Sequence, residues 1–143
     1  MGLIKSLLGK KIFLDTAPLI YYIEENSNYL QKLNELFEVK NRCRFVTSVI
    51  TLSEVLVMPF RERRYELARQ YENILIHAEN VDIYEMNIQI AKKTAQLRSR
   101  YSIKTPDAIQ LATALYCSVD FFLTNDLKLK SINELNIITL DEL

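Results

Sequence analysis

The sequence predicts a three-layer α/β/α fold with a central, mostly parallel sheet of about five short strands. Two observations carry this prediction. Short apolar runs recur along the chain, and the stretches between them place apolar residues at helical spacing. Strands that alternate with helices in this way form parallel sheets with helices on both faces. At 143 residues the chain is long enough for one domain with a real core, and we interpret it as such.

The elements follow from these runs in order. The first half is expected to contain strands at 11–14 and 43–47 and a helix that Thr16 caps and that continues to Glu24 and Glu25. It is also expected to contain a second helix from Leu30 that stops near Lys40 and Asn41, a turn at 48–51, and a short helix at 53–58 that Pro59 ends. The second half is expected to contain helices at 61–76, 86–101, 105–115 and 127–135 and strands at 81–84, 119–124 and 137–140. Residues 1–10 precede this pattern, and we interpret them as an N-terminal extension, either an extra helix or a gene-specific addition.

The composition excludes several classes of protein. The only two glycines, Gly2 and Gly9, precede the first strand, so no glycine-rich phosphate loop or dinucleotide-binding fingerprint exists. No apolar run approaches the roughly 20 residues of a membrane span. Cys43 and Cys117 lie in apolar surroundings without metal-ligand spacing, which is typical of small core residues in a cytoplasmic protein.

The stretch Thr-Pro-Asp-Ala-Ile-Gln-Leu-Ala-Thr-Ala, residues 105–114, predicts a helix that is buried nearly all round. Thr105 is expected to be its N-cap, with Pro106 in the first turn. Asp107 follows in the same turn. A carboxylate at the mouth of a buried helix needs a proton, a base, a backbone donor or a metal as its partner. On this stretch alone, a capping role for Asp107 stays equally open.

Three further acids follow strands in the predicted fold. Asp15 follows the first strand, Glu54 the second and Asp126 the fourth, while Asp107 begins the helix that leads to the fourth strand. Sites in parallel sheets lie beyond the carboxyl ends of the strands, so we expect these four carboxylates to converge. Each acid taken singly is also typical of a turn or a helix start. Together they favour a metal site.

Crowded carboxylates repel one another, and a divalent cation removes the conflict. All-oxygen ligands select hard ions, so Mg²⁺ or Mn²⁺ is expected rather than zinc. Such a site polarises a phosphate and activates water, which predicts metal-assisted hydrolysis of a phosphodiester. The single histidine, His77, lies in an apolar stretch without a recognisable nucleophile, so a Ser-His-Asp mechanism is not expected.

The four acids lie in motifs that resemble those of the PIN-domain nucleases, and most closely the VapC-type toxin ribonucleases. The matching pieces are Phe-Leu-Asp-Thr at 13–16, Ser-Glu-Val at 53–55, the stretch at 105–114 and Leu-Thr-Asn-Asp at 123–126. The resemblance implies a Mg²⁺- or Mn²⁺-dependent ribonuclease with Asp15, Glu54, Asp107 and Asp126 as its acidic site. It places Thr124, and less firmly Asn125, beside the metal. It further implies an RNA substrate, a homodimer and a cognate antitoxin protein.

Two alternatives stay open at this point. A phosphoryl-accepting receiver domain also carries acids at strand ends, but it needs paired acids near the first strand, and only Asp15 is present there. A catalytically silent PIN-like module that binds RNA or protein would have the same fold. The net charge is zero, unlike that of most nucleic-acid binders. Two local basic clusters are interpreted as solvated helix faces rather than phosphate-binding surfaces: Arg61, Arg63 and Arg64; and Lys92, Lys93, Arg98, Arg100 and Lys104.

Overall fold

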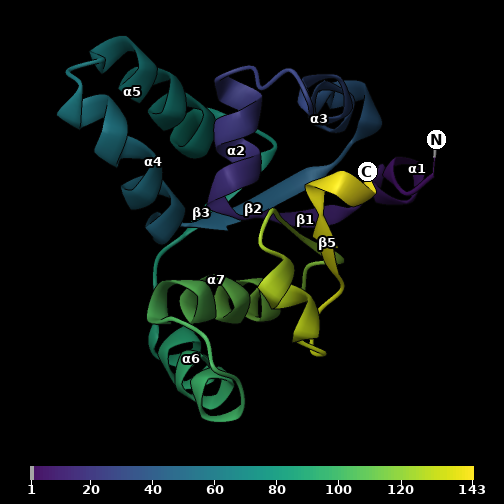
Figure 1. The fold of residues 1–143 in the computed structure, drawn as a ribbon, viewed down its shortest axis with the longest axis vertical. Coiled ribbons are helices and arrows are strands. Elements are labelled where there is room, and N and C mark those ends of the chain that lie inside the picture. Colours follow the sequence, from purple (N-terminus) through teal and green to yellow (C-terminus); the bar gives the residue numbers. More distant parts are fainter. Residues whose placement is uncertain (1) are drawn as a thin grey trace.

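A computed structural model describes residues 2–143, which form seven α-helices and five strands (Figure 1). The helices are α1 (Ile4–Leu7), α2 (Thr16–Ile23), α3 (Leu30–Phe37), α4 (Val49–Arg61), α5 (Tyr65–Glu72), α6 (Ile88–Arg100) and α7 (Thr105–Tyr116). The strands are β1 (Lys11–Leu14), β2 (Arg44–Ser48), β3 (Val81–Tyr84), β4 (Phe121–Thr124) and β5 (Ile137–Thr139).

The five strands form one sheet in the order β3-β2-β1-β4-β5, and every neighbouring pair is parallel. The predicted fold class is therefore confirmed, with an all-parallel rather than a mostly parallel sheet. β1 lies in the centre, where Phe13 is in register with Val46 of β2 and with Phe122 of β4. All strands end at the same edge because all run the same way.

Alternation along β1 divides the core into two layers. Ile12 and Leu14 lie on the face that helices α1 to α5 cover, whereas Phe13 lies on the face that α6 and α7 cover. Figure 1 shows these two groups of helices on opposite sides of the sheet. The rings of Phe13 and Phe122 stack with centroids 4.9 Å apart beneath α7. Burial on both faces explains why the central strand β1 and its neighbour β4 are mostly apolar.

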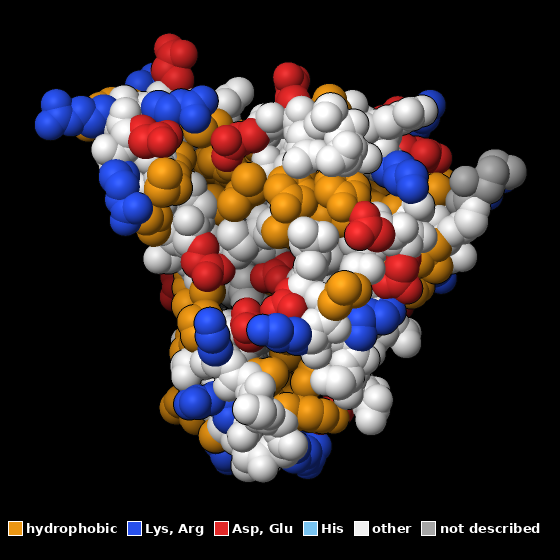
Figure 2. All heavy atoms as spheres, viewed as in Figure 1, with side chains coloured by type: hydrophobic (Ala, Val, Ile, Leu, Met, Phe, Trp, Pro, Cys, Tyr) orange, Lys and Arg blue, Asp and Glu red, His pale blue; other side chains and the backbone are white. Residues whose placement is uncertain are grey.

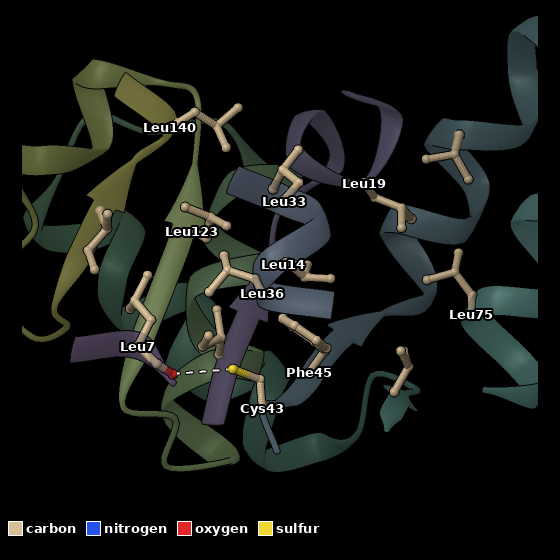
Figure 3. Close-up of a cluster of buried hydrophobic side chains, with 14 of the residues drawn as sticks. Leu7, Leu14, Leu19, Leu33, Leu36, Cys43, Phe45, Leu75, Leu123 and Leu140 are labelled. Atoms are coloured by element: carbon tan, nitrogen blue, oxygen red, sulfur yellow. Dashed lines mark hydrogen bonds between the residues drawn. The ribbon is translucent and has the colours of Figure 1, made fainter. Parts of the chain in front are cut away.

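The predicted N-terminal extension packs into the core as a short helix. Ile4 and Leu7 of α1 are buried among the side chains of the first core layer. Figure 3 shows Leu7 beside Cys43, whose thiol donates a 3.3 Å hydrogen bond to the Leu7 carbonyl. Cys43 and Cys117 are both free and buried, and burial raises the pKa of each thiol. Among residues 2–143, the structure contains no helix with the length and apolar character needed to cross a membrane.

The helix after β2 begins earlier and ends later than predicted. We expected a turn at 48–51 and a short helix ended by Pro59, but α4 runs from Val49 to Arg61 with Pro59 inside it. The Ser48 side chain starts the helix because its oxygen accepts a hydrogen bond from the Ile50 amide at 3.1 Å. Pro59 removes one amide donor from α4, and only Phe60 and Arg61 follow it in the helix.

Several other boundaries also differ from the predictions. The helix expected at 61–76 begins only at Tyr65, because Arg63 adopts a left-handed backbone (φ 55°) that separates α4 from α5. A π-helical turn, Asn73–His77, follows α5. Ser118 has a similar φ of 53°, so β4 begins at Phe121 rather than at residue 119. The helix expected at 127–135 is only a 3₁₀ turn, Leu127–Ser131.

Candidate functional site

Four elements bring carboxylates to one cleft beyond the carboxyl ends of the strands. Asp15 follows β1 directly, Asp126 follows β4, Asp107 lies in the first turn of α7, and Glu54 projects from α4. The cleft measures about 340 Å³ and is lined by these acids together with Thr16, Ala17, Ile20, Thr124 and Asn125. Figure 2 shows acidic side chains gathered in a hollow between the upper helices and α7. All six residues that the sequence selected therefore lie at one cleft.

Asp15 is held by two donors at the end of β1. Its Oδ1 accepts a 2.9 Å hydrogen bond from the Thr16 amide, so Asp15 is the N-cap of α2. The prediction that Thr16 caps this helix is therefore wrong by one residue. Its Oδ2 accepts a 2.7 Å hydrogen bond from the hydroxyl of Thr124, which is fully buried at the end of β4. The same hydroxyl accepts a hydrogen bond from the Asp126 amide at 3.1 Å, so Thr124 connects two of the four acids.

Glu54 reaches the cleft from the second turn of α4, not from the first turn that the sequence suggested. Its Oε1 accepts a 2.6 Å hydrogen bond from the Thr16 hydroxyl. The two residues lie 38 positions apart in sequence. Thr16 therefore orients Glu54, a role that sequence reasoning missed because it assigned Thr16 to helix capping.

Asp107 is the most electrostatically strained of the four acids. It does not cap α7: the N-cap is Lys104 rather than the predicted Thr105, and no side-chain capping bond forms there. Burial raises the pKa of the Asp107 carboxyl above its ordinary value, and the negative charges of the other three acids raise it further. The effect of the other three charges shows that they lie close enough to act on Asp107.

Asp126 and Asn125 complete the cleft. Oδ1 of Asp126 accepts a 3.0 Å hydrogen bond from the Lys128 amide and thereby starts the 3₁₀ turn. Asp126 therefore has the turn role that its position alone suggested, and its second oxygen is not used in this contact. The Asn125 amide donates a 3.3 Å hydrogen bond to the Tyr21 hydroxyl at the exposed rim.

The cleft carries negative charge without a compensating cation. The ion pairs within residues 2–143 include none of the four acids. The donor set consists of oxygen atoms only, which fits a hard divalent cation. Within the described part of the chain, no group of three acidic, histidine or cysteine side chains has the spacing of a complete metal-binding site.

A buried hydrogen-bond network joins the two helices that supply Glu54 and Asp107. Gln110 of α7 is 1% exposed and accepts a short hydrogen bond from the Ser48 hydroxyl. Its amide donates to the Thr51 hydroxyl at 2.5 Å. Sequence reasoning missed this network. The signal was present, because Gln110 is the longest polar side chain in a helix otherwise predicted to be apolar.

The chain matches a known family over most of its length. The family described as "PIN domain" matches residues 12–135, which include all four acids. No curated protein sequence gives a significant match.

Solved structures with similar folds are components of toxin–antitoxin systems. VapBC2 from Rickettsia felis, bound to a promoter DNA fragment, aligns with a TM-score of 0.72 at 18% identity over 90% of this chain and 98% of that one. A toxin–antitoxin complex from Klebsiella pneumoniae gives 0.69 at 25% identity, over 92% and 99% of the two chains. VapC20 from Mycobacterium tuberculosis, a toxin that cleaves the sarcin–ricin loop, gives 0.67 at 14% identity, over 87% and 98%.

Proposed function

The chain belongs to the PIN-domain family of nucleases, and we propose that it is a Mg²⁺- or Mn²⁺-dependent endoribonuclease. One observation carries this proposal. Asp15, Glu54, Asp107 and Asp126 share a cleft in which no cation within residues 2–143 forms an ion pair with any of them. Negative charge that is concentrated without an ion-pair partner is costly for a fold, and acids whose pKa is raised by burial and by neighbouring charges, as that of Asp107 is, cluster at functional sites.

Each side chain then has a defined part in the proposed reaction. The four carboxylates would hold the cation, which supplies polarisation of the scissile phosphate and activation of water. Thr124 keeps Asp15 and Asp126 at a fixed separation through its two hydrogen bonds. Thr16 restrains Glu54 in the same way. Both oxygens of Asp15 accept a hydrogen bond, so Asp15 would bind the cation through their remaining lone pairs. Glu54 and Asp126 each accept a hydrogen bond through one carboxylate oxygen, which would leave the second oxygen of each for the cation.

We extend the proposal to partners. The similar folds include toxins crystallised with their antitoxins, and we propose that this chain is the toxin of such a pair, with a protein antitoxin as its inhibitor.

Val57, Phe60 and Tyr65 are at least 47% exposed on α4 and α5, and we propose that a second copy of the chain covers them. Light scattering of the purified chain measures this dimer, and a monomer at all concentrations would contradict it.

The deciding experiment is cleavage of labelled total RNA with Mg²⁺ or Mn²⁺. We expect cutting that stops on chelation and falls at least about a hundredfold in Asp107→Asn, because loss of one charged ligand weakens both metal binding and transition-state stabilisation. Asp120→Asn is the matched control. Asp120 lies at the opposite edge of the sheet, where its carboxylate accepts a 2.9 Å hydrogen bond from the Lys11 amide.

The control should cleave RNA at the rate of the unmodified chain. Equal loss in both variants would indicate a general effect of charge or folding and would count against the site. A folded chain that neither cuts RNA nor binds metal would favour the catalytically silent RNA- or protein-binding module instead.

A further inference from the structure

A second pocket lies next to the acidic cleft, between the end of α6 and the start of α7. It encloses about 810 Å³ and is lined by Ala95, Arg98, Ser99, Tyr101, Ser102, Ile103 and Lys104. Six of these seven residues belong to the last turns of α6 or to the loop that leads to Asp107. The acidic cleft and this pocket are therefore joined by a few residues of backbone.

The pocket carries positive charge that the fold does not use. No acidic side chain lines it, and among residues 2–143 neither Arg98 nor Lys104 has a carboxylate within ion-pair distance. Nε of Arg98 donates a 3.3 Å hydrogen bond to the Ile103 carbonyl, which ties the side chain to the loop. A guanidinium has five N–H donors, so most of them stay available to a ligand.

The neighbouring Arg100 is an example of a cation that is paired within this fold. Arg100 forms a 3.2 Å ion pair with Glu134, and the Tyr101 hydroxyl donates to the same carboxylate. The negative charge of Glu134 is thereby engaged outside the pocket. Arg98 and Lys104 differ from Arg100 in having no such partner, although all three belong to one short segment.

The other basic cluster lacks these properties. Arg61, Arg63 and Arg64 are interleaved with acidic residues, and Arg64 lies 3.7 Å from the carboxylate of Glu62. They also lie at the far end of α4 or just after it, more than a helical turn from Glu54. The α6–α7 segment is therefore the better-placed source of positive charge.

Lys104 lies close enough to act on the acidic cleft. As the N-cap of α7 it precedes Asp107 by three residues, which corresponds to about 4.5 Å along a helix axis. Figure 2 shows lysine and arginine side chains bordering the acidic hollow on the side of α7.

We propose that Arg98 and Lys104 form a subsite that binds backbone phosphates of the RNA next to the phosphodiester held in the acidic cleft. This inference rests on the proposed ribonuclease function. A polyanion that enters a cleft with four carboxylates needs nearby positive charge, and the zero net charge of the chain supplies no general attraction. The pocket supplies this positive charge to phosphates of the same RNA strand. The sequence alone favoured a solvated helix face for these residues; their missing partners and their place beside Asp107 change that interpretation.

The test measures RNA binding separately from cleavage. Fluorescence anisotropy follows a fluorescein-labelled, mixed-sequence single-stranded RNA of about 12 nucleotides, in Mg²⁺, with the Asp15→Asn chain as the non-cleaving reference. Asn retains the capping oxygen that Asp15 supplies to α2. Arg98→Gln/Lys104→Gln in this background should raise the Kd about tenfold or more at 0.1 M salt. The slope of log K against log salt should fall by about 1.4, or about 0.7 for each phosphate contact.

A matched control removes the same charges elsewhere. Lys5→Gln/Arg42→Gln also loses one lysine and one arginine, both exposed, near the amino ends of β1 and β2. This variant should bind RNA like the reference. Equal Kd values and salt slopes for the two double variants would overturn the inference.

The cleavage arm separates this inference from the proposed function. In the otherwise unmodified chain, Arg98→Gln/Lys104→Gln should raise the KM for RNA while kcat stays within about twofold, because the metal-binding acids are intact. Cleavage with an unchanged KM would overturn the subsite and leave the ribonuclease in place. Absence of cleavage in every chain, with the binding loss still present, would overturn the ribonuclease and leave the phosphate subsite in place.

Discussion

The two edges of the central sheet differ in how their charged side chains are paired. Near the amino ends of the strands, charged groups have partners: Arg44 forms a 2.8 Å ion pair with Asp82, and Asp120 accepts a hydrogen bond from the Lys11 amide at 2.9 Å. The ammonium group of Lys11 in turn donates to the Cys117 carbonyl at 2.6 Å. At the carboxyl ends, four acids share a cleft with hydroxyl and amide donors but no ion-pair partner within residues 2–143.

This difference distinguishes acids that are paired within the fold from acids that crowd one another without an ion-pair partner among residues 2–143. A carboxylate with a cation at hydrogen-bond distance stabilises the native state modestly. A carboxylate whose nearest charges are other carboxylates destabilises it, unless something outside the chain supplies positive charge. The fold tolerates the second arrangement at one edge only, which is the edge where parallel sheets hold their ligands.

Among variants that leave all four acids in place, the largest expected effect comes from Thr124→Val, which tests whether the hydroxyl at the end of β4 organises the acids. Removing it deprives Asp15 of one donor and the Asp126 amide of one acceptor. Side chains that orient metal ligands typically contribute about 10- to 100-fold to affinity or activity. We expect a loss of this size in RNA cleavage, with a parallel weakening of Mg²⁺ binding measured by calorimetry.

Thr139→Val is the control for Thr124→Val. Thr139 is in register with Thr124 on β5 and is also buried, but its hydroxyl contacts Glu142 in a capping box instead of the cleft. This variant should lose about 1 kcal/mol of stability without an effect on cleavage. A larger loss of cleavage in Thr139→Val than in Thr124→Val would show that the acids do not depend on this hydroxyl.

The next effect is on stability, and it comes from Gln110, which joins α7 to α4. Gln110→Leu removes the side chain that both Ser48 and Thr51 contact in the interior. Unsatisfied buried polar groups cost about 1–3 kcal/mol each, so we expect a loss of about 2–3 kcal/mol in chemical denaturation. Because Glu54 and Asp107 lie on these two helices, Mg²⁺ affinity should fall too. Denaturation at the stability of the unmodified chain would contradict a structural role for this network.

The convergence of the acids could be predicted from the sequence because it depends on strand order and direction alone. Asp15 and Asp126 come after apolar runs that could only be strands, and parallel pairing then places both at one edge. Asp107 was recognisable from an apolar helix with a single acid in its first turn. These inferences need no side-chain geometry, so they survived errors of several residues in the element boundaries.

The contacts between side chains could not be predicted in the same way. The β-branched run Val49-Ile50-Thr51 disfavours a helix by local propensity, yet these residues begin α4 because Ser48 caps it and Gln110 anchors it. The predicted turn at 48–51 was therefore wrong, and the late helix start that it implied also placed Glu54 in the first turn. The partners of Thr16 and Gln110 lie 38 and 59–62 positions away, a separation at which sequence spacing carries no information.

The smallest effect is the most direct test of the two edges, because one chemical change should have opposite signs at each. Since the folded-state pKa of Asp107 is raised above its unfolded value by burial and by the other acids, the native state binds the proton more tightly. The free energy of unfolding therefore falls as the pH rises through the interval between the two pKa values, and the full penalty is present above the raised pKa.

Asp107→Asn removes this penalty, so the metal-free variant should melt at a higher temperature than the unmodified chain at neutral pH. The gain should disappear below the ordinary pKa of aspartate, where the carboxyl is protonated in both states. Asp82→Asn at the amino edge should instead cost between 0 and about 1 kcal/mol at neutral pH, because it removes the exposed partner of Arg44. With saturating Mg²⁺ the unmodified chain should instead melt at a higher temperature than Asp107→Asn. An ion at 100 times its Kd stabilises the native state by about 2.7 kcal/mol, and the variant binds the ion more weakly. Metal-free Asp107→Asn that melts below the unmodified chain would mean that Asp107 is already compensated, and the distinction between the two edges would fail at its most strained residue.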